Sequence, residues 1–144
     1  MKIKNQYGFT LTEIIIVLVI IAILLAVGIP MYHKHVTKMH RADGVVSLLN
    51  LSNRLEQYYA KHHSFETATI GTGNSNTDVL NTNKSEAGFY TLSILTKGAN
   101  NFIIEAKPNP KQAKADSRCG TLRLNEMGQK SITGTGSLDD CWSY

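Results

Sequence analysis

The longest hydrophobic feature of the chain is an unbroken apolar block near the N-terminus. Every residue at positions 14–29 is apolar or glycine. As a helix, residues 9–29 would measure about 31 Å, which matches the hydrocarbon core of a bilayer. Because such a helix is apolar on nearly all sides, it must be buried in lipid or among other apolar helices.

A second helical pattern begins after Pro30. Apolar residues recur there at steps of three and four, as in an amphipathic helix: Val45, Leu48, Leu51, Leu55, Tyr58 and Tyr59. The two patterns together predict one helix over about residues 9–61, roughly 80 Å long. Gly28 and Pro30 are predicted to mark a bend, since proline removes a backbone hydrogen bond and glycine weakens a helix.

The C-terminal part of the chain has the alternation of β-strands. Residues 64–88 are rich in Gly, Asn, Thr and Ser and predict a connecting loop. Strands are then predicted at residues 89–95, 102–106, 120–125 and 130–132, with a loop rich in Pro, Lys and Ala after the second. The predicted fold is α+β, a long N-terminal helix packed on an antiparallel sheet of three or four strands.

This pattern divides the chain into five parts. Residues 1–8 are a polar leader, residues 9–30 the apolar helix, and residues 31–63 the amphipathic half of the helix. Residues 64–88 form the loop, and residues 89–144 form the sheet with both cysteines, Cys119 and Cys141. We expect one disulfide between these cysteines, because two thiols in a small exported domain usually pair.

The composition excludes several classes of function. The formal net charge is +4, and it falls to about +2 without Lys2 and Lys4, which is too mild to imply a nucleic-acid partner. No nucleophile motif, phosphate-binding glycine loop or pair of catalytic carboxylates is present, so we do not expect an enzyme. The five histidines lack Asp, Glu or Cys partners at zinc-binding spacing, and neither a metal nor a cofactor is predicted.

The N-terminal apolar block has three interpretations. An ordinary signal peptide would be cut after the apolar block, where Ala26-Val27-Gly28 could serve. A simple single-pass anchor would explain the length of the block. Both leave Glu13 unexplained, since a carboxylate at the start of an apolar helix is costly without a partner.

The third interpretation explains this carboxylate. A short basic leader ending in Gly8, followed by Phe9-Thr10-Leu11-Thr12-Glu13 and a long apolar helix, resembles the N-terminal signal of type IV prepilins. The resemblance implies that a prepilin peptidase cuts between Gly8 and Phe9 and methylates Phe9. It also implies a protein held in the inner membrane before assembly and packed with other pilin subunits into an extracellular filament afterwards. Glu13 would then meet the Phe9 ammonium of a neighbouring subunit and set the register.

The C-terminal half resembles PilE-type minor pilins. The resemblance rests on Phe89-Tyr90-Thr91-Leu92-Ser93-Ile94, on Arg118-Cys119-Gly120-Thr121-Leu122, on Gly128 and on the final Cys141-Trp142. In that family a disulfide bounds the C-terminal region, which maps here to residues 119–141. The implied function is a minor pilin of a bacterial type IV pilus that serves adhesion, twitching motility or DNA uptake.

Two other functions remain open at this stage. A pseudopilin of a type II secretion system would share the helix, although such subunits often carry calcium in place of a disulfide. A DNA-binding pilin of a competence system would use extracellular DNA as its partner, and a host surface is another possible partner. The candidate DNA contacts are Lys107, Lys111, Lys114 and Arg118, a sparse basic stretch without interleaved aromatic residues.

Overall fold

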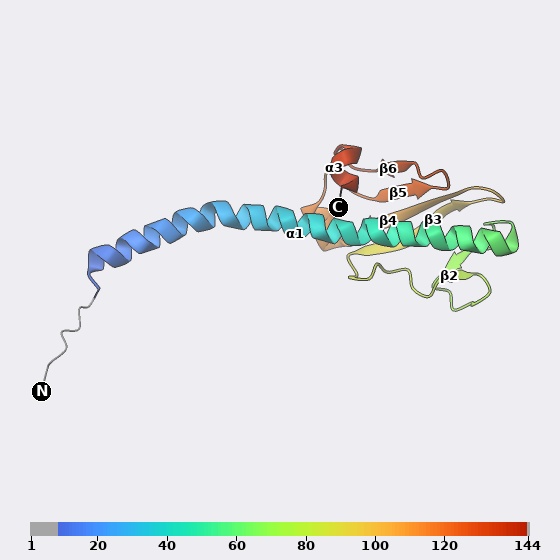
Figure 1. The fold of residues 1–144 in the computed structure, drawn as a ribbon, viewed down its shortest axis with the longest axis horizontal. Helices are drawn as coiled ribbons and strands as arrows, with labels where there is room; N and C mark the ends of the chain where they lie inside the picture. The colour runs from blue at the N-terminus through green and yellow to red at the C-terminus, as the bar shows by residue number, and fades with distance from the viewer. Residues whose placement is uncertain (1–8, 144) are drawn as a thin grey trace, which may run out of the picture. The chain divides into compact units, whose positions relative to one another are not determined.

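The computed structural model describes residues 9–143, and its first element is one continuous helix. α1 spans Leu11–His62 (Figure 1). The prediction of a single long helix is therefore confirmed. The helix continues through Gly28 and Pro30 without interruption, so neither residue opens a turn, and a bend there stays a prediction.

The chain divides into two compact units, with the boundary between Val36 and Thr37. The first contains the apolar segment, which we define as residues 14–29. The second, residues 37–143, is called the body here, and it contains the remainder of α1 and every strand.

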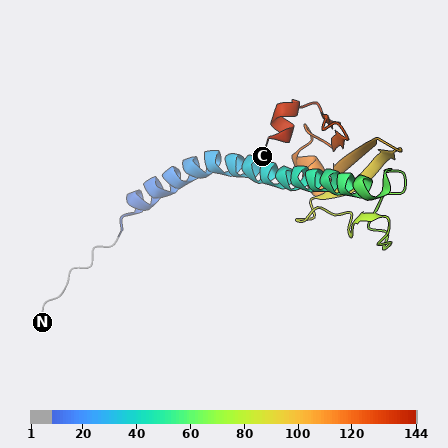
Figure 2. The same ribbon diagram turned by 45° about the vertical axis from the view of Figure 1, so that its right-hand side comes forward.

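In the body, α1 packs along one face of a four-stranded antiparallel sheet (Figure 2). The strands follow one another in the order β3-β4-β5-β6. Their bounds are β3 Tyr90–Lys97, β4 Phe102–Pro108, β5 Leu122–Asn125 and β6 Lys130–Ile132. The predicted α+β fold is confirmed.

The core lies between α1 and the sheet. The predicted helical stripe is buried except for Tyr59, which is half-buried. The sheet contributes alternate residues from its inner face, namely Tyr90, Leu92, Phe102, Ile104, Ala106, Leu122 and Leu124. Helix and sheet approach closely at Gly44, where a Cβ atom would lie 2.8 Å from the Tyr90 ring. Only glycine fits this position without displacing the ring.

Residues 64–88 are more ordered than a connecting loop. They contain two short strands, β1 Thr69–Ile70 and β2 Asp78–Leu80, which pair in parallel. The Asp78 carboxylate holds the turn between them by accepting hydrogen bonds from the Thr69 and Thr72 hydroxyls and from the Gly73 amide. Such short polar strands lack the alternation from which strands are predicted.

Two short helices also differ from the expected loops. α2, Pro110–Ala115, replaces part of the loop rich in Pro, Lys and Ala, and the Asn109 side chain caps it. α3, Leu138–Trp142, closes the chain and is capped by Ser137. Figures 1 and 2 show α3 and β2 on opposite sides of α1. The start signals, Asn-Pro and Ser followed by acidic residues, are visible in the sequence.

Candidate functional sites

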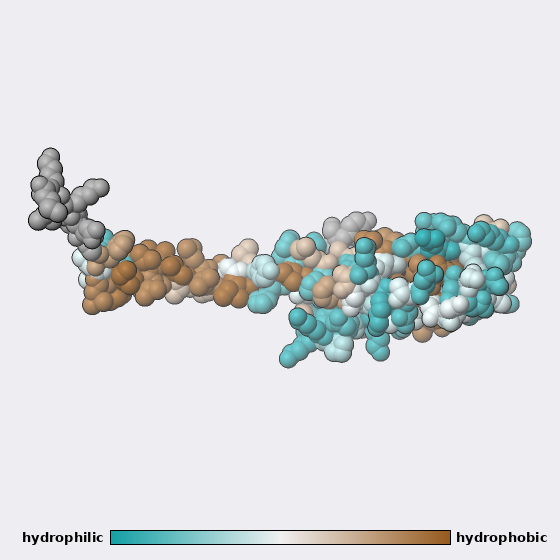
Figure 3. All heavy atoms as spheres, turned by 90° about the horizontal axis from the view of Figure 1, so that it is seen from below, coloured by the Kyte–Doolittle hydropathy of each residue, from teal (hydrophilic) through white to brown (hydrophobic). Residues whose placement is uncertain are grey.

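The apolar segment exposes its hydrophobic side chains all along its length. Its Ile, Leu and Val side chains are between 46% and 65% exposed. Figure 3 shows them as an unbroken apolar surface on the face in view. The helix that carries them is long and apolar enough to cross a membrane. The segment therefore needs lipid or further apolar helices as a partner.

Glu13 has a partner within its own chain. The backbone amide and the hydroxyl of Thr10 both donate to Glu13 Oε2, at 3.1 and 3.0 Å. The Glu13 amide in turn donates to the Thr10 hydroxyl at 3.3 Å. This reciprocal arrangement is a capping box, which stabilises the first turn of a helix. Sequence reasoning missed it, although Thr-x-x-Glu is its recognised signal.

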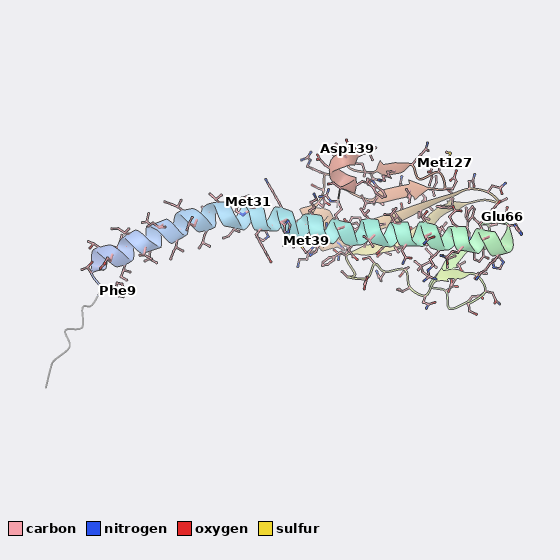
Figure 4. All side chains as sticks on the ribbon, viewed as in Figure 1. Phe9, Met31, Met39, Glu66, Met127 and Asp139 are labelled. Atoms are coloured by element: carbon pink, nitrogen blue, oxygen red, sulfur yellow. A yellow bond between two sulfur atoms is a disulfide. The ribbon has the colours of Figure 1, made fainter. Side chains whose placement is uncertain are left out.

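Phe9 precedes α1 and is 84% exposed (Figure 4). Its side chain lies one residue before the capping Thr10, so the predicted new N-terminus would be adjacent to the first turn of the helix. Gly8, on the other side of the predicted cleavage point, lies outside the described residues.

The body contains the expected disulfide. Cys119 and Cys141 are joined, and their Cα atoms lie 5.5 Å apart. Arg41 of α1 reaches this region by donating to the Asp140 carbonyl at 2.8 Å and to Cys119 Sγ at 2.9 Å. Its Nε also lies 3.0 Å from Asp116 Oδ2, an ion pair between two side chains that are about nine-tenths buried.

The ion pair offsets part of the free-energy cost of burying the Asp116 carboxylate. Burial raises the pKa of Asp116 above its ordinary value, while the positive charges of Arg41 and Arg118 act in the opposite direction. Arg41 therefore joins α1 to the segment before the disulfide and to α3. The C-terminal region is held to α1 by this side chain, while the disulfide links Cys119 to Cys141 within that region.

A buried amide joins α2 to α1. Gln112 is 2% exposed, and its Nε2 donates to the Thr37 carbonyl at 3.1 Å. Its Oε1 lies 3.2 Å from His40 Nδ1, and the His40 ring stacks on Phe89. His40 is therefore part of the packing between α1, α2 and Phe89. His33 and His35 are exposed.

The four predicted DNA contacts are all exposed, but they come from two elements and a turn. Lys107 lies on β4, Lys111 and Lys114 lie on α2, and Arg118 precedes the disulfide. Arg118 also lines a hollow of about 320 Å³ together with Lys38, Arg41, Asp116 and Asp140. Lys38 is distant in sequence from the basic stretch, so no pattern of neighbouring residues predicted that it lines the same hollow as Arg118.

Within residues 9–143, no group of three or more His, Cys, Asp or Glu side chains is placed to hold an ion. The hollow beside the disulfide is lined by three cationic side chains, Lys38, Arg41 and Arg118.

Two family models match this chain. The family model described as "Type IV minor pilin ComP, DNA uptake sequence receptor" matches residues 30–123, and the "Prokaryotic N-terminal methylation motif" matches residues 3–29. The chain therefore belongs to the type IV minor pilin family.

Several individual relatives can be compared. "Type IV major pilin protein PilE1" of Neisseria gonorrhoeae is 27% identical, over 68% of this chain and 63% of its own. "Type II secretion system core protein G" of Escherichia coli is 33% identical over 46% of each chain. The chain thus spans less than two thirds of the length of these curated relatives. The minor pilin PilV of Neisseria meningitidis aligns with a TM-score of 0.47 and 21% identity, over 70% of this chain and 93% of that one.

Proposed function

We propose that this chain is a structural subunit of a type IV pilus. It is held in the inner membrane by the apolar segment, cut between Gly8 and Phe9, methylated at Phe9, and then packed into an extracellular filament. The observation that carries the proposal is the exposure of every large side chain of the apolar segment, which lies within the match to the N-terminal methylation motif. Lipid covers these side chains before assembly, and the helices of other subunits cover them afterwards.

Glu13 sets the register of this packing. Both Thr10 bonds reach Oε2, so we assign the second oxygen, Oε1, to the Phe9 ammonium of a neighbouring subunit. Inside a dry bundle such a pair adds little net stability, because desolvation offsets the attraction. A helix packed out of register would leave both charges unpaired, which is strongly unfavourable, so the pair selects one arrangement.

The first test is the mass of the exported protein. We expect the loss of the first eight residues and the gain of one methyl group on Phe9, measured by intact-mass spectrometry. A product severed near residues 26–28 would lack the apolar segment and would contradict the proposal.

A second test addresses Glu13 directly. Glu13→Gln keeps the size of the side chain and removes its charge, so we expect processed subunits that fail to enter filaments. Glu66→Gln, on the exposed surface of the body, is the matched control and should enter as the parent does. Equal incorporation of Glu13→Gln and the parent into sheared filaments would refute the pairing.

A receptor for DNA is the second candidate function. It is favoured by the description of the matching family as a DNA uptake sequence receptor and by the exposure of Lys107, Lys111, Lys114 and Arg118. If Lys111 and Lys114 each contact a phosphate, replacing both by alanine should reduce the slope of log affinity against log salt by about 1.8. Arg54→Ala with Lys61→Ala removes the same charge elsewhere on the body and is the control. Absence of duplex binding at low salt would exclude this function.

A pseudopilin of a type II secretion system is the remaining alternative. Its support is the partial match to the core protein G, which spans under half of either chain. The pilus is preferred because the minor pilin family model covers most of the body. Assembly of the protein in cells that contain only pilus machinery would separate the two.

A further inference from the structure

Four exposed cations gather at one end of the body. Lys38 lies in the first turn of the body's part of α1, next to Thr37. Lys111 and Lys114 lie on α2, which Gln112 bonds to the Thr37 carbonyl. Arg118 lines the same hollow as Lys38. We call these four residues the basic collar.

The basic collar is close in the chain to the end of the apolar segment. Thr37 follows Pro30 by seven residues, which span about 10 Å as a helix and at most about 25 Å if fully extended. This limit holds for any orientation of the body. The headgroup layer extends about 5–7 Å beyond the hydrocarbon on each side. Because α1 continues without interruption from Pro30 to Thr37, the helical spacing applies, and Thr37 lies within a few ångströms of the headgroup layer when the apolar segment spans a bilayer.

The residues between the two have the character of a membrane interface. Tyr32, His33, Lys34 and His35 follow Met31, and all four are exposed. Tyrosine is enriched at the level of the headgroups, because its ring is apolar and its hydroxyl is polar, which suits the boundary between lipid and water. The boundary of the membrane therefore falls between the apolar segment and the body.

We propose that the basic collar binds the headgroups of anionic phospholipids while the subunit waits in the membrane. This inference rests on the proposed membrane-held stage, and it gives the collar a role before assembly. The binding would hold the body against the membrane surface, and extraction into a filament would break it. Any contact of the same side chains with DNA belongs to the later, extracellular stage.

The charge balance at this end supports the proposal. Asp116 is buried and paired with Arg41, so it does not cancel the collar. Asp140 also lines the hollow, and Asp139 precedes it on α3. Asp43 accepts a hydrogen bond from the Ala87 amide. Exposed positive charges outnumber the exposed carboxylates, and each lysine or arginine near an anionic surface favours the bound state by about fivefold.

The test measures amide hydrogen exchange of α2 in the full chain. The protein is placed in nanodiscs of phosphatidylcholine alone, in nanodiscs that also contain phosphatidylglycerol, and in neutral micelles. We expect exchange in residues 110–115 to slow by at least about fivefold when phosphatidylglycerol is present, and high salt to reverse this change. Equal exchange in both nanodiscs would overturn the proposal.

Two charge variants make the test specific. Lys111→Gln with Lys114→Gln should abolish the slowing, whereas Arg54→Gln with Lys61→Gln, near the far end of α1, should keep it. Exchange in neutral micelles is the control for a general loosening of α2. If either double variant loosens α2, its exchange will also be faster in micelles, where no lipid charge is present. Loss of the slowing in both pairs would mean a general effect of net charge and would also refute the collar.

Two further outcomes separate the proposals. Flotation with vesicles reports insertion of the apolar segment, so a chain that does not float contradicts the membrane-held stage itself. A chain that floats but shows no lipid-dependent exchange contradicts only the collar. If duplex DNA slows exchange of α2 and phosphatidylglycerol does not, the collar recognises nucleic acid and the lipid proposal is wrong.

Discussion

Tyr90 is the side chain at which three elements of the body converge. Its ring lies beneath Gly44 of α1, it begins β3, and its hydroxyl lies 3.4 Å from Gln112 Nε2 of α2. It is 1% exposed. Burial raises the pKa of Tyr90 to about 12, because a phenolate would lose its hydration there, and the Gln112 bond only partly opposes this.

This shift predicts a loss of stability in alkali. An unfolded tyrosine ionises near pH 10, so the contribution of Tyr90 is complete below pH 10 and is lost as the pH rises towards 12. A shift of two pKa units corresponds to about 2.7 kcal/mol of unfolding free energy. Urea unfolding at a series of pH values should show this loss, and Tyr90→Phe should remove it.

Tyr32→Phe is the control for the alkaline experiment. Tyr32 is exposed and lies outside the body, so its removal should leave the pH dependence as in the parent. If Tyr90→Phe and the parent lost stability equally above pH 10, the phenol would not be the group responsible.

At the scale of elements, the contact between α1 and β3 depends on the absence of a side chain at Gly44. The helix carries its apolar stripe into the sheet, and the inner face of the sheet alternates to meet it. Val45 and Leu48, which follow Gly44 on α1, are fully buried. Helix and sheet must therefore fit closely at this point, because interiors are packed without spare volume.

Gly44→Ala should destabilise the body. The added Cβ would lie 2.8 Å from the Tyr90 ring, and overpacking of this kind costs about 1–3 kcal/mol. The higher helix propensity of alanine would offset up to about 1 kcal/mol of that. Gly28→Ala, whose Cβ meets nothing within 4 Å, is the control and should leave unfolding of the body unchanged. An unfolding midpoint of Gly44→Ala equal to that of the parent would contradict the close contact.

At the scale of the whole molecule, the body buries its hydrophobic side chains by itself, whereas the apolar segment needs a partner to bury them. The buried hydrophobic residues all lie in the body, from Val45 to Trp142, while the apolar segment buries none of its large side chains within the described chain. The body thus has its own core and one disulfide, and the apolar segment depends on a partner. This division suits a subunit whose helix passes from lipid to other helices while its body stays folded.

Removal of residues 1–36 should therefore leave the body intact. We expect the shortened chain to be soluble without detergent and to unfold at the temperature of the full chain in detergent, measured by circular dichroism. The full chain without detergent should associate through the exposed apolar segment. A much lower unfolding temperature for the shortened chain would mean that the apolar segment supports the core.

Local patterns explain which parts of this protein could be predicted. Hydrophobic periodicity is visible over short stretches of the chain. It was therefore enough to predict the apolar segment and the helical stripe as helix, and the alternating segments as strands. β1, β2, α2 and α3 are too short for a period, and their order comes from side chains such as Asp78 and Asn109 that hydrogen-bond to nearby backbone. The Thr10 to Glu13 capping box was visible as a motif but was overlooked.

By itself, the sequence determined the prepilin N-terminus, the membrane-length helix and the α+β class, because each depends on residues close together in the chain. Three features depend on the folded structure: the contacts of Arg41 with Asp116 and the disulfide, the lack of room for a side chain at Gly44, and the position of Lys38 beside α2. These contacts bring together residues dozens of positions apart. They arise when helix and sheet pack, and no short-range pattern encodes them.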